Sequence, residues 1–211
     1  MIVKLPVASL RRALLALALG ACASLASAAS TFHVELDTSS FTSTGWIELL
    51  FNPGGVTSPL AQVSLTGFTG FGDSSTAQLN GNASGSLAGG YTFVNNDVGG
   101  WNGLFHAVDF GGKIGFNVTF SGAADPGAGF GSAFSVALYN QAQDALLGTN
   151  DPTGSLVLLN WTPEGTVVPT MLNNTIATSV SAVSAVPEAQ TWLMMGAGLA
   201  LLGGMARRRK V

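Results

Sequence analysis

The sequence predicts an all-β fold, an antiparallel β-sandwich of jelly-roll type formed by residues 29–170. Apolar residues alternate with polar ones in short runs, which is the pattern of half-buried strands. Gly, Asn and Asp separate these runs and favour turns, and no run keeps the period of an amphipathic helix. About eight to ten short strands with few helices are typical of two packed antiparallel sheets.

The predicted strands follow from this alternation. Residues 113–120 give the clearest one, because every second residue from Ile114 to Phe120 is Ile, Phe or Val. Residues 46–51 have apolar side chains on both faces, which indicates a strand covered on both sides. In chain order, the predicted strands are residues 32–37, 46–51, 62–68, 91–94, 104–110, 113–120, 134–138 and 156–161.

Aromatic residues supply the predicted core. All twelve phenylalanines lie between Phe32 and Phe134, and fully burying one stabilises a fold by about 1.5 to 3 kcal/mol. The single cysteine, Cys22, precedes this region. The sandwich is therefore expected to use no disulfide bond, and burial of aromatic rings helps to offset that absence.

The first 28 residues predict a secretory signal peptide. Basic residues precede an apolar run at 13–21, and small residues lead to a cleavage site after Ala28, with Ala29 as the alternative position. The run is shorter than the about 20 apolar residues of a membrane-spanning helix. A second interpretation stays open, because the residues up to Cys22 resemble the lipobox before a lipidated cysteine, which would make the N-terminus an anchor.

Charge restricts the partners of residues 29–186. This segment has ten acidic residues and one basic residue, Lys113, which gives a net charge of −9 with His neutral. Such a surface repels nucleic acid and anionic lipid head groups, so no nucleic-acid partner is expected. Cations such as calcium, and neutral glycans, are better electrostatic partners.

The C-terminal end predicts a single membrane helix over residues 191–206. These sixteen residues carry no charge, and at about 1.5 Å per residue they span roughly 24 Å, slightly less than the hydrocarbon core of a bilayer. Four glycines within the run and the basic residues after it disfavour a buried core helix. Positive residues stay on the cytoplasmic side, so the membrane stop consists of Arg207, Arg208, Arg209 and Lys210.

A short motif stands directly before the predicted helix. Val186, Pro187 and Glu188 follow residues 171–185, a segment rich in Ser, Thr, Ala and Val that predicts a flexible spacer. With the apolar helix and the basic end, the motif resembles the PEP-CTERM sorting domain. It matches the first three positions of the Val-Pro-Glu-Pro motif of that family, and Ala189 replaces the second proline. The sorting tail is then residues 186–211.

This resemblance implies a processing route. Signal peptidase would remove the leader, and exosortase, a membrane-embedded cysteine transpeptidase, would cleave the tail. The protein would pass transiently through the inner membrane and then reach the cell surface or extracellular matrix. Pro187 keeps the residue before it extended and the motif accessible. A permanently anchored envelope protein with an uncleaved tail is the alternative.

The middle of the chain also resembles an uncharacterised, β-rich group of PEP-CTERM proteins. That group has no assigned activity, so this resemblance implies no chemistry. The motifs that carry it are Leu36-Asp37-Thr38-Ser39, Phe51-Asn52-Pro53-Gly54, Phe110-Gly111-Gly112 with Ile114 and Phe116, and Asp151-Pro152-Thr153-Gly154.

Candidate nucleophiles and metal ligands are few. Ser74 lies in a Gly-Asp-Ser sequence similar to the serine block of GDSL-type esterases, but the Asp-x-x-His block of that family does not follow, which favours a loop residue. His33 and His106 alternate with apolar neighbours, which favours solvent-facing or hydrogen-bonded structural roles over zinc binding. Gly127 to Gly131 predict a loop and no phosphate cradle.

The acidic residues leave two chemistries open. Two carboxylates at a fixed separation suffice for a glycosidase, and carboxylate oxygens suit calcium, although no D-x-D-x-D-G loop occurs. Most acids stand beside Gly, Pro, Asn or Ser, where they favour turns. These turn candidates include Asp73, Asp97, Asp125, Asp144 and Asp151. We therefore predict no catalytic site and no cofactor, with calcium as the cation that would suit these oxygens.

Three classes of function remain, in a definite order. The first is a structural or adhesive protein of extracellular polymer, the second a glycan-binding module of the envelope, and the third an enzyme. Trp46, Trp101 and Trp161 either stack on sugars or pack in the core, and the sequence leaves both alternatives open. Extracellular polysaccharide is accordingly the partner expected beside the membrane and the two processing enzymes.

Overall fold

The computed structural model describes residues 29–96, 100–184 and Gly198. The predicted signal peptide with its cleavage site after Ala28 lies outside these residues. The predicted sorting motif, membrane helix and basic end in residues 186–211 lie outside them too, apart from Gly198. Among the residues that are described, no helix combines the length and the apolar character needed to cross a membrane.

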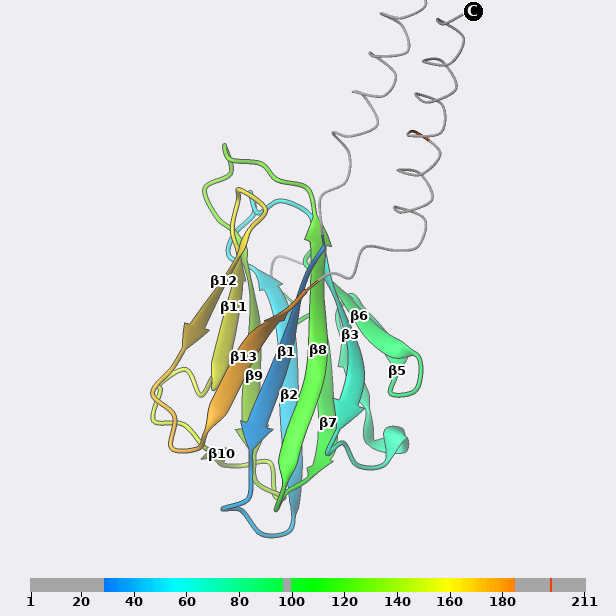
Figure 1. Ribbon diagram of the computed structural model, residues 1–211, viewed down its shortest axis with the longest axis vertical. Coiled ribbons are helices and arrows are strands. Elements are labelled where there is room, and N and C mark those ends of the chain that lie inside the picture. Colours follow the sequence, from blue (N-terminus) through cyan, green and yellow to red (C-terminus); the bar gives the residue numbers. More distant parts are fainter. Residues whose placement is uncertain (1–28, 97–99, 185–197, 199–211) are drawn as a thin grey trace, which may run out of the picture.

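The described chain is all-β, as predicted, and its strands pair antiparallel in two sheets (Figure 1). A short 3₁₀ helix, η1 (Ser74–Thr76), joins two of them. The strands are β1 (Ser30–Asp37), β2 (Thr44–Pro53), β3 (Ala61–Thr69), β4 (Gln78–Asn80), β5 (Ala83–Ser86), β6 (Gly90–Val94), β7 (Gly103–Asp109), β8 (Lys113–Gly122), β9 (Ser132–Tyr139), β10 (Leu146–Leu147), β11 (Val157–Trp161), β12 (Val167–Met171) and β13 (Thr178–Val183).

The chain crosses repeatedly between the two sheets. Sheet A has the strand order β13-β1-β8-β3-β6-β5, and sheet B the order β12-β11-β9-β2-β7-β4, with β10 beside β9. Strands β1 and β8, β2 and β7, and β3 and β6 form successive antiparallel pairs, each nested inside the one before. Because Thr31 pairs with Val183, the two ends of the described domain lie next to each other.

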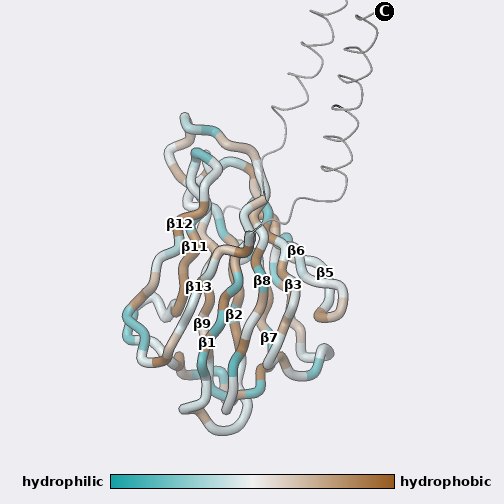
Figure 2. The backbone as a smooth tube through the Cα atoms, viewed as in Figure 1, coloured by the Kyte–Doolittle hydropathy of each residue, from teal (hydrophilic) through white to brown (hydrophobic). Residues whose placement is uncertain are grey.

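The two sheets pack together through aromatic rings on their central strands. Phe116 and Phe120 of β8 in sheet A meet Phe134 of β9 in sheet B, with ring centroids 6.2 and 6.3 Å apart. The Phe120 ring also lies parallel to the Trp161 ring of β11. All four side chains are buried, which confirms the inner faces predicted for residues 113–120 and 134–138. Figure 2 shows hydrophobic stretches along these strands and hydrophilic stretches at many of the turns.

Five of the thirteen strands in the described part were not predicted, namely β4, β5, β10, β12 and β13. They are short or lie at sheet edges, and most of their residues are exposed, so they lack the apolar alternation of a buried strand. The predicted count of eight to ten is therefore too low.

The prediction of a flexible spacer over residues 171–185 is wrong for Thr178–Val183. Thr178–Val183 forms β13, which pairs with β1 over six residues from Leu36↔Thr178 to Thr31↔Val183. Small and β-branched residues without aromatics suit an exposed edge strand as well as a linker. Here Val180 packs against the core, while the serines on either side of it face outward.

Candidate functional site

The outer face of sheet B is hollowed near its β4 edge. The hollow has a volume of about 470 Å³. One carboxylate, two side-chain amides and two aromatic rings contribute to its wall, together with two glycines. Its lining residues are Glu48, Gln78, Asn80, Gly81, Gly100, Trp101 and Phe105. We call this hollow the sheet B groove.

Strand pairing brings the groove residues together from distant parts of the sequence. Gln78 of β4 pairs with Phe105 of β7, and Phe105 pairs with Glu48 of β2, so the three side chains form one row across the sheet. Asn80 follows two positions after Gln78 and so projects from the same face. The groove floor therefore consists of regular β structure.

Trp101 forms the exposed wall of the groove, in the loop before β7. Its side chain is 66% exposed, the highest value among the described tryptophans. The loop is fixed by the buried Asn102, whose backbone N–H donates to Asn52 Oδ1 at 2.9 Å and whose Oδ1 accepts from the Asn82 N–H at 2.9 Å. Gly81 has φ +60, and a Cβ there would lie 2.5 Å from the Trp101 carbonyl oxygen, so only glycine allows this approach.

The Phe105 ring is held from two sides. Trp46 stacks on it with a centroid distance of 5.0 Å and an interplanar angle of 4°. Tyr139 meets it edge-on at 5.5 Å. The Phe105 ring is therefore held in place by neighbouring aromatic side chains. Trp46, Glu48 and Leu50 are only partly buried, so the prediction that strand 46–51 is covered on both faces is not confirmed: β2 is fully buried on its inner face alone.

Glu48 is the carboxylate of the groove. The Tyr139 hydroxyl donates a hydrogen bond to Glu48 Oε2 at 3.2 Å. Burial raises the pKa of Glu48 above its ordinary value of 4.5, and the bond from Tyr139 opposes this rise only in part. Tyr139 has a raised pKa for the corresponding reasons, first burial and then the nearby Glu48 charge. Glu48 thus presents a fixed acceptor beside the aromatic rings.

The raised pKa of Glu48 predicts a pH-dependent effect of Glu48→Gln. A carboxyl group with a raised folded-state pKa costs stability once the pH rises above about 4.5, because the folded protein must then hold a desolvated charge. Gln carries no such charge. The difference in melting temperature, variant minus native protein, should therefore be larger at pH 7 than at pH 4.

Glu164→Gln is the matched control for this experiment. Hydrogen bonds from the Thr162 side chain and from the Glu164 backbone lower the pKa of Glu164, so its removal should cost stability at pH 7 and little at low pH. The two variants should thus diverge in opposite directions as the pH rises. A parallel response of both variants would contradict the assigned environment of Glu48.

The structure separates the three candidate tryptophans. Trp161 is 2% exposed and belongs to the core, so its sugar-stacking alternative is wrong. Trp46 stacks on the Phe105 ring, and Trp101 lines the groove. Residue type and spacing alone did not indicate Glu48, Gln78 and Asn80 as groove residues. The alternation of Gln78 and Asn80 around Leu79 was the available signal for β4.

Both histidines have structural contacts. His33 Nδ1 lies 2.9 Å from Asn117 Oδ1 on the outer face of sheet A. His106 is fully buried between the sheets, with Nδ1 2.7 Å from the Ala107 carbonyl oxygen. Its Nε2 meets no hydrogen-bond partner among the described residues. The hydrogen-bonded role is confirmed for His106, and the solvent-facing alternative is wrong for it.

Several carboxylates form turns, as expected. The Oδ1 atoms of Asp73, Asp125 and Asp151 accept backbone N–H groups two residues further on, at 2.8, 3.0 and 2.9 Å. Asp144 Oδ1 accepts from the Asn140 side chain, and Asp97 lies outside the described residues.

In the part of the chain that is described, no three His, Cys, Asp or Glu residues gather as metal ligands would. Ser74 is exposed in η1.

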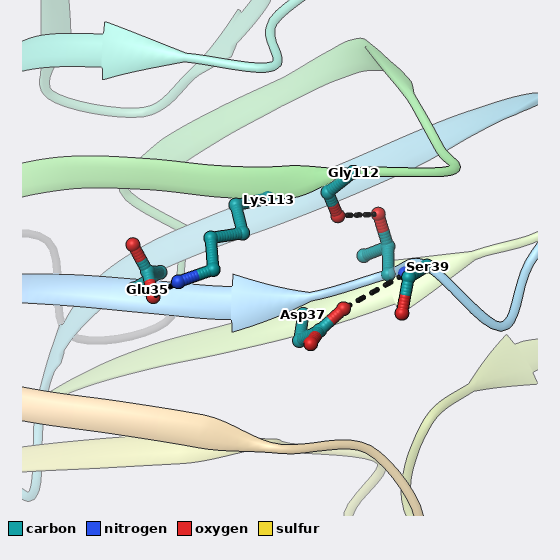
Figure 3. A network of polar contacts seen from close by, with 6 residues as sticks. Glu35, Asp37, Ser39, Gly112 and Lys113 are labelled. Atoms are coloured by element: carbon teal, nitrogen blue, oxygen red, sulfur yellow. Dashed lines mark hydrogen bonds and ion pairs between the residues drawn. The ribbon is translucent and has the colours of Figure 1, made fainter.

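Two of the sequence motifs of the middle region, Leu36–Ser39 and Phe110–Gly112, meet at one corner of sheet A (Figure 3). The buried Thr38 donates to the Gly112 carbonyl oxygen through its hydroxyl at 2.7 Å and its backbone N–H at 2.8 Å. Lys113 Nζ lies 2.7 Å from Glu35 Oε1. Hydrogen bonds from Ser39 lower the pKa of Asp37. These motifs therefore build turns and leave the groove untouched.

The sorting motif lies outside the described residues, and the motifs of the middle form turns. No protein-family model, curated protein or solved structure matches the chain. The functional proposal therefore rests on the residues and geometry of the chain itself.

Proposed function

We propose that the protein is an exported cell-surface or extracellular-matrix protein that adheres to neutral polysaccharide through the sheet B groove. The observation that carries the proposal is the exposed Trp101 ring, which lines the same groove as Phe105, Glu48 and two side-chain amides. Aromatic faces stack on the C–H faces of sugar rings, while carboxylates and amides hydrogen-bond to sugar hydroxyl groups.

Charge and site composition support binding of neutral sugars. Glu48, the one carboxylate among the described groove residues, can accept hydrogen bonds from sugar hydroxyl groups. The acidic balance of the domain also repels uronic-acid and sulfated polymers. The full-length chain, purified in detergent, should bind neutral polysaccharides on a glycan array and leave acidic ones unbound. Failure to bind any neutral polysaccharide would contradict the proposal.

We also propose that the sandwich has jelly-roll connectivity. The nested antiparallel pairs β1–β8, β2–β7 and β3–β6 support it, because a long hairpin folded into two sheets produces this order. Strands β9 and β11 to β13 then extend both sheets on the side away from the groove.

The proposed route to the surface is the PEP-CTERM tail, with signal peptidase and exosortase as processing enzymes. The order of Val186, Pro187, Glu188, apolar run and basic end supports it. Because β13 ends at Val183, two residues separate the domain from this motif in the sequence. Before cleavage the domain would therefore be held close to the outer face of the inner membrane.

Co-expression with an exosortase tests this route. The native chain should lose its basic C-terminal end only when the enzyme is present, as seen by mass spectrometry of the intact protein. Glu188→Gln should retain the tail, whereas Glu164→Gln, a like change outside the motif, should be processed normally. A retained tail in the native chain with the enzyme present would instead support the permanently anchored alternative.

A further inference from the structure

Besides the two-residue β10, the two described sheets have four edge strands, and three of these are protected against pairing with other chains. In sheet B, β4 has only three residues, and β12 contains Pro169, which has no N–H to donate. In sheet A, β5 has four residues and is distorted at Gly85, with φ +118. Short strands, prolines and local distortion are common protections of sheet edges.

The fourth edge, β13, lacks these protections. It has six residues, Thr178–Val183, without proline, glycine or charge, and it keeps regular pairing with β1 along its whole length. Its other side has no strand neighbour in the described sheets. A regular strand of this kind presents unpaired backbone N–H and C=O groups along that side.

Exposed apolar residues occur on β13 itself and on β12, the strand that precedes it in the chain. Met171, Val168 and Val183 are 49, 48 and 43% exposed. No charged residue occurs from Gly165 to Ser184, in a domain that is otherwise strongly acidic. The adjacent strand β1 has two carboxylates. Glu35, opposite Ser179, is paired with Lys113 at 2.7 Å, and Asp37 lies at the end of β1, where its backbone N–H donates to the Ala177 carbonyl oxygen before β13 begins.

We propose that β13 pairs antiparallel with β13 of a second copy of this chain, joining two A sheets into one. A second copy suits the edge because it brings an identical uncharged strand that also needs hydrogen-bond partners. Contact through most other faces would bring together two acidic surfaces, which repel each other. The partner of β13 is therefore another β13.

This pairing is independent of the sheet B groove, which lies at the β4 side of the other sheet. Both grooves of a dimer would stay open. If the proposed polysaccharide binding holds, two grooves on one particle would bind a repeating polymer more tightly than either groove alone. The dimer itself does not rest on that function.

Single-cysteine crosslinking tests the pairing in the full-length exported chain. In a Cys22→Ser background, Ser179→Cys and Ser181→Cys place a thiol on exposed positions of β13, and Ser84→Cys places one on the exposed β5 edge. Diamide, which accepts the two electrons released when two thiols form a disulfide, should convert at least one β13 variant mainly into covalent dimers. The β5 variant should stay monomeric on non-reducing gels.

A charge on the open edge supplies the second measurement. Ser181→Lys should shift the mass measured by light scattering from dimer to monomer, because a lysine blocks edge pairing. Ser84→Lys adds the same charge to β5 and should leave the dimer intact. A monomeric native chain, or equal crosslinking from β13 and β5, would overturn the proposal whatever the glycan array shows.

Discussion

Trp101→Ala is expected to reduce affinity for neutral polysaccharide by roughly 30-fold or more, since truncation of a central aromatic anchor costs about 2 kcal/mol or more. Trp101 is 66% exposed, so its loss removes a stacking surface without opening the core. The melting temperature should therefore stay near that of the native chain. Titration of the immobilised full-length chain with the polysaccharide identified on the array measures the change.

Two further variants make this result specific to the groove. Trp101→Phe keeps an aromatic face and should retain most of the affinity. Phe130→Ala removes another exposed ring, 55% exposed, from a loop outside the groove, and should leave binding unchanged. Equal losses for Trp101→Ala and Phe130→Ala would show that binding does not depend on the sheet B groove.

The groove shows where sequence reasoning ends for this chain. The three tryptophans were candidates by residue type alone, because an indole suits both sugars and cores. What distinguishes Trp161 from Trp101 is position. Trp161 lies parallel to Phe120 on an inner face, and Trp101 lies in a loop held by Asn102. Only the pairing of β4, β7 and β2 places Gln78 and Glu48 in the same row.

Strand prediction succeeded where burial leaves a pattern in the sequence. Residues 113–120 lie in β8, at the centre of sheet A, so one face must be apolar and the alternation is unambiguous. β13 lies at the edge, with most of its residues exposed, and small polar residues are tolerated there. The same lack of burial that hid β13 from prediction is what leaves its outer side open to a partner.

Phe116→Ala and Phe134→Ala should each lower the free energy of unfolding by about 3 to 5 kcal/mol, the usual cost of removing a buried phenylalanine ring. Both side chains are fully buried and lie on opposite sheets. For a domain of this size, each kcal/mol lowers the melting temperature by about 2 to 4 °C, so each variant should melt roughly 6 to 20 °C lower. Calorimetry of the full-length chain measures the shift.

The double variant shows whether the two sheets share one core. The Phe116 and Phe134 rings meet edge to face with centroids 6.2 Å apart, and such pairs contribute about 0.5 to 1.5 kcal/mol beyond the area that they bury. The combined loss should differ from the sum of the single losses by an amount of this order. Phe130→Ala, which removes the same atoms at the surface, should change stability by only about 0.5 kcal/mol. Unchanged melting temperatures for both core variants would contradict the packing of sheet A on sheet B, because no rearrangement of a shared core absorbs the loss of two facing rings without cost.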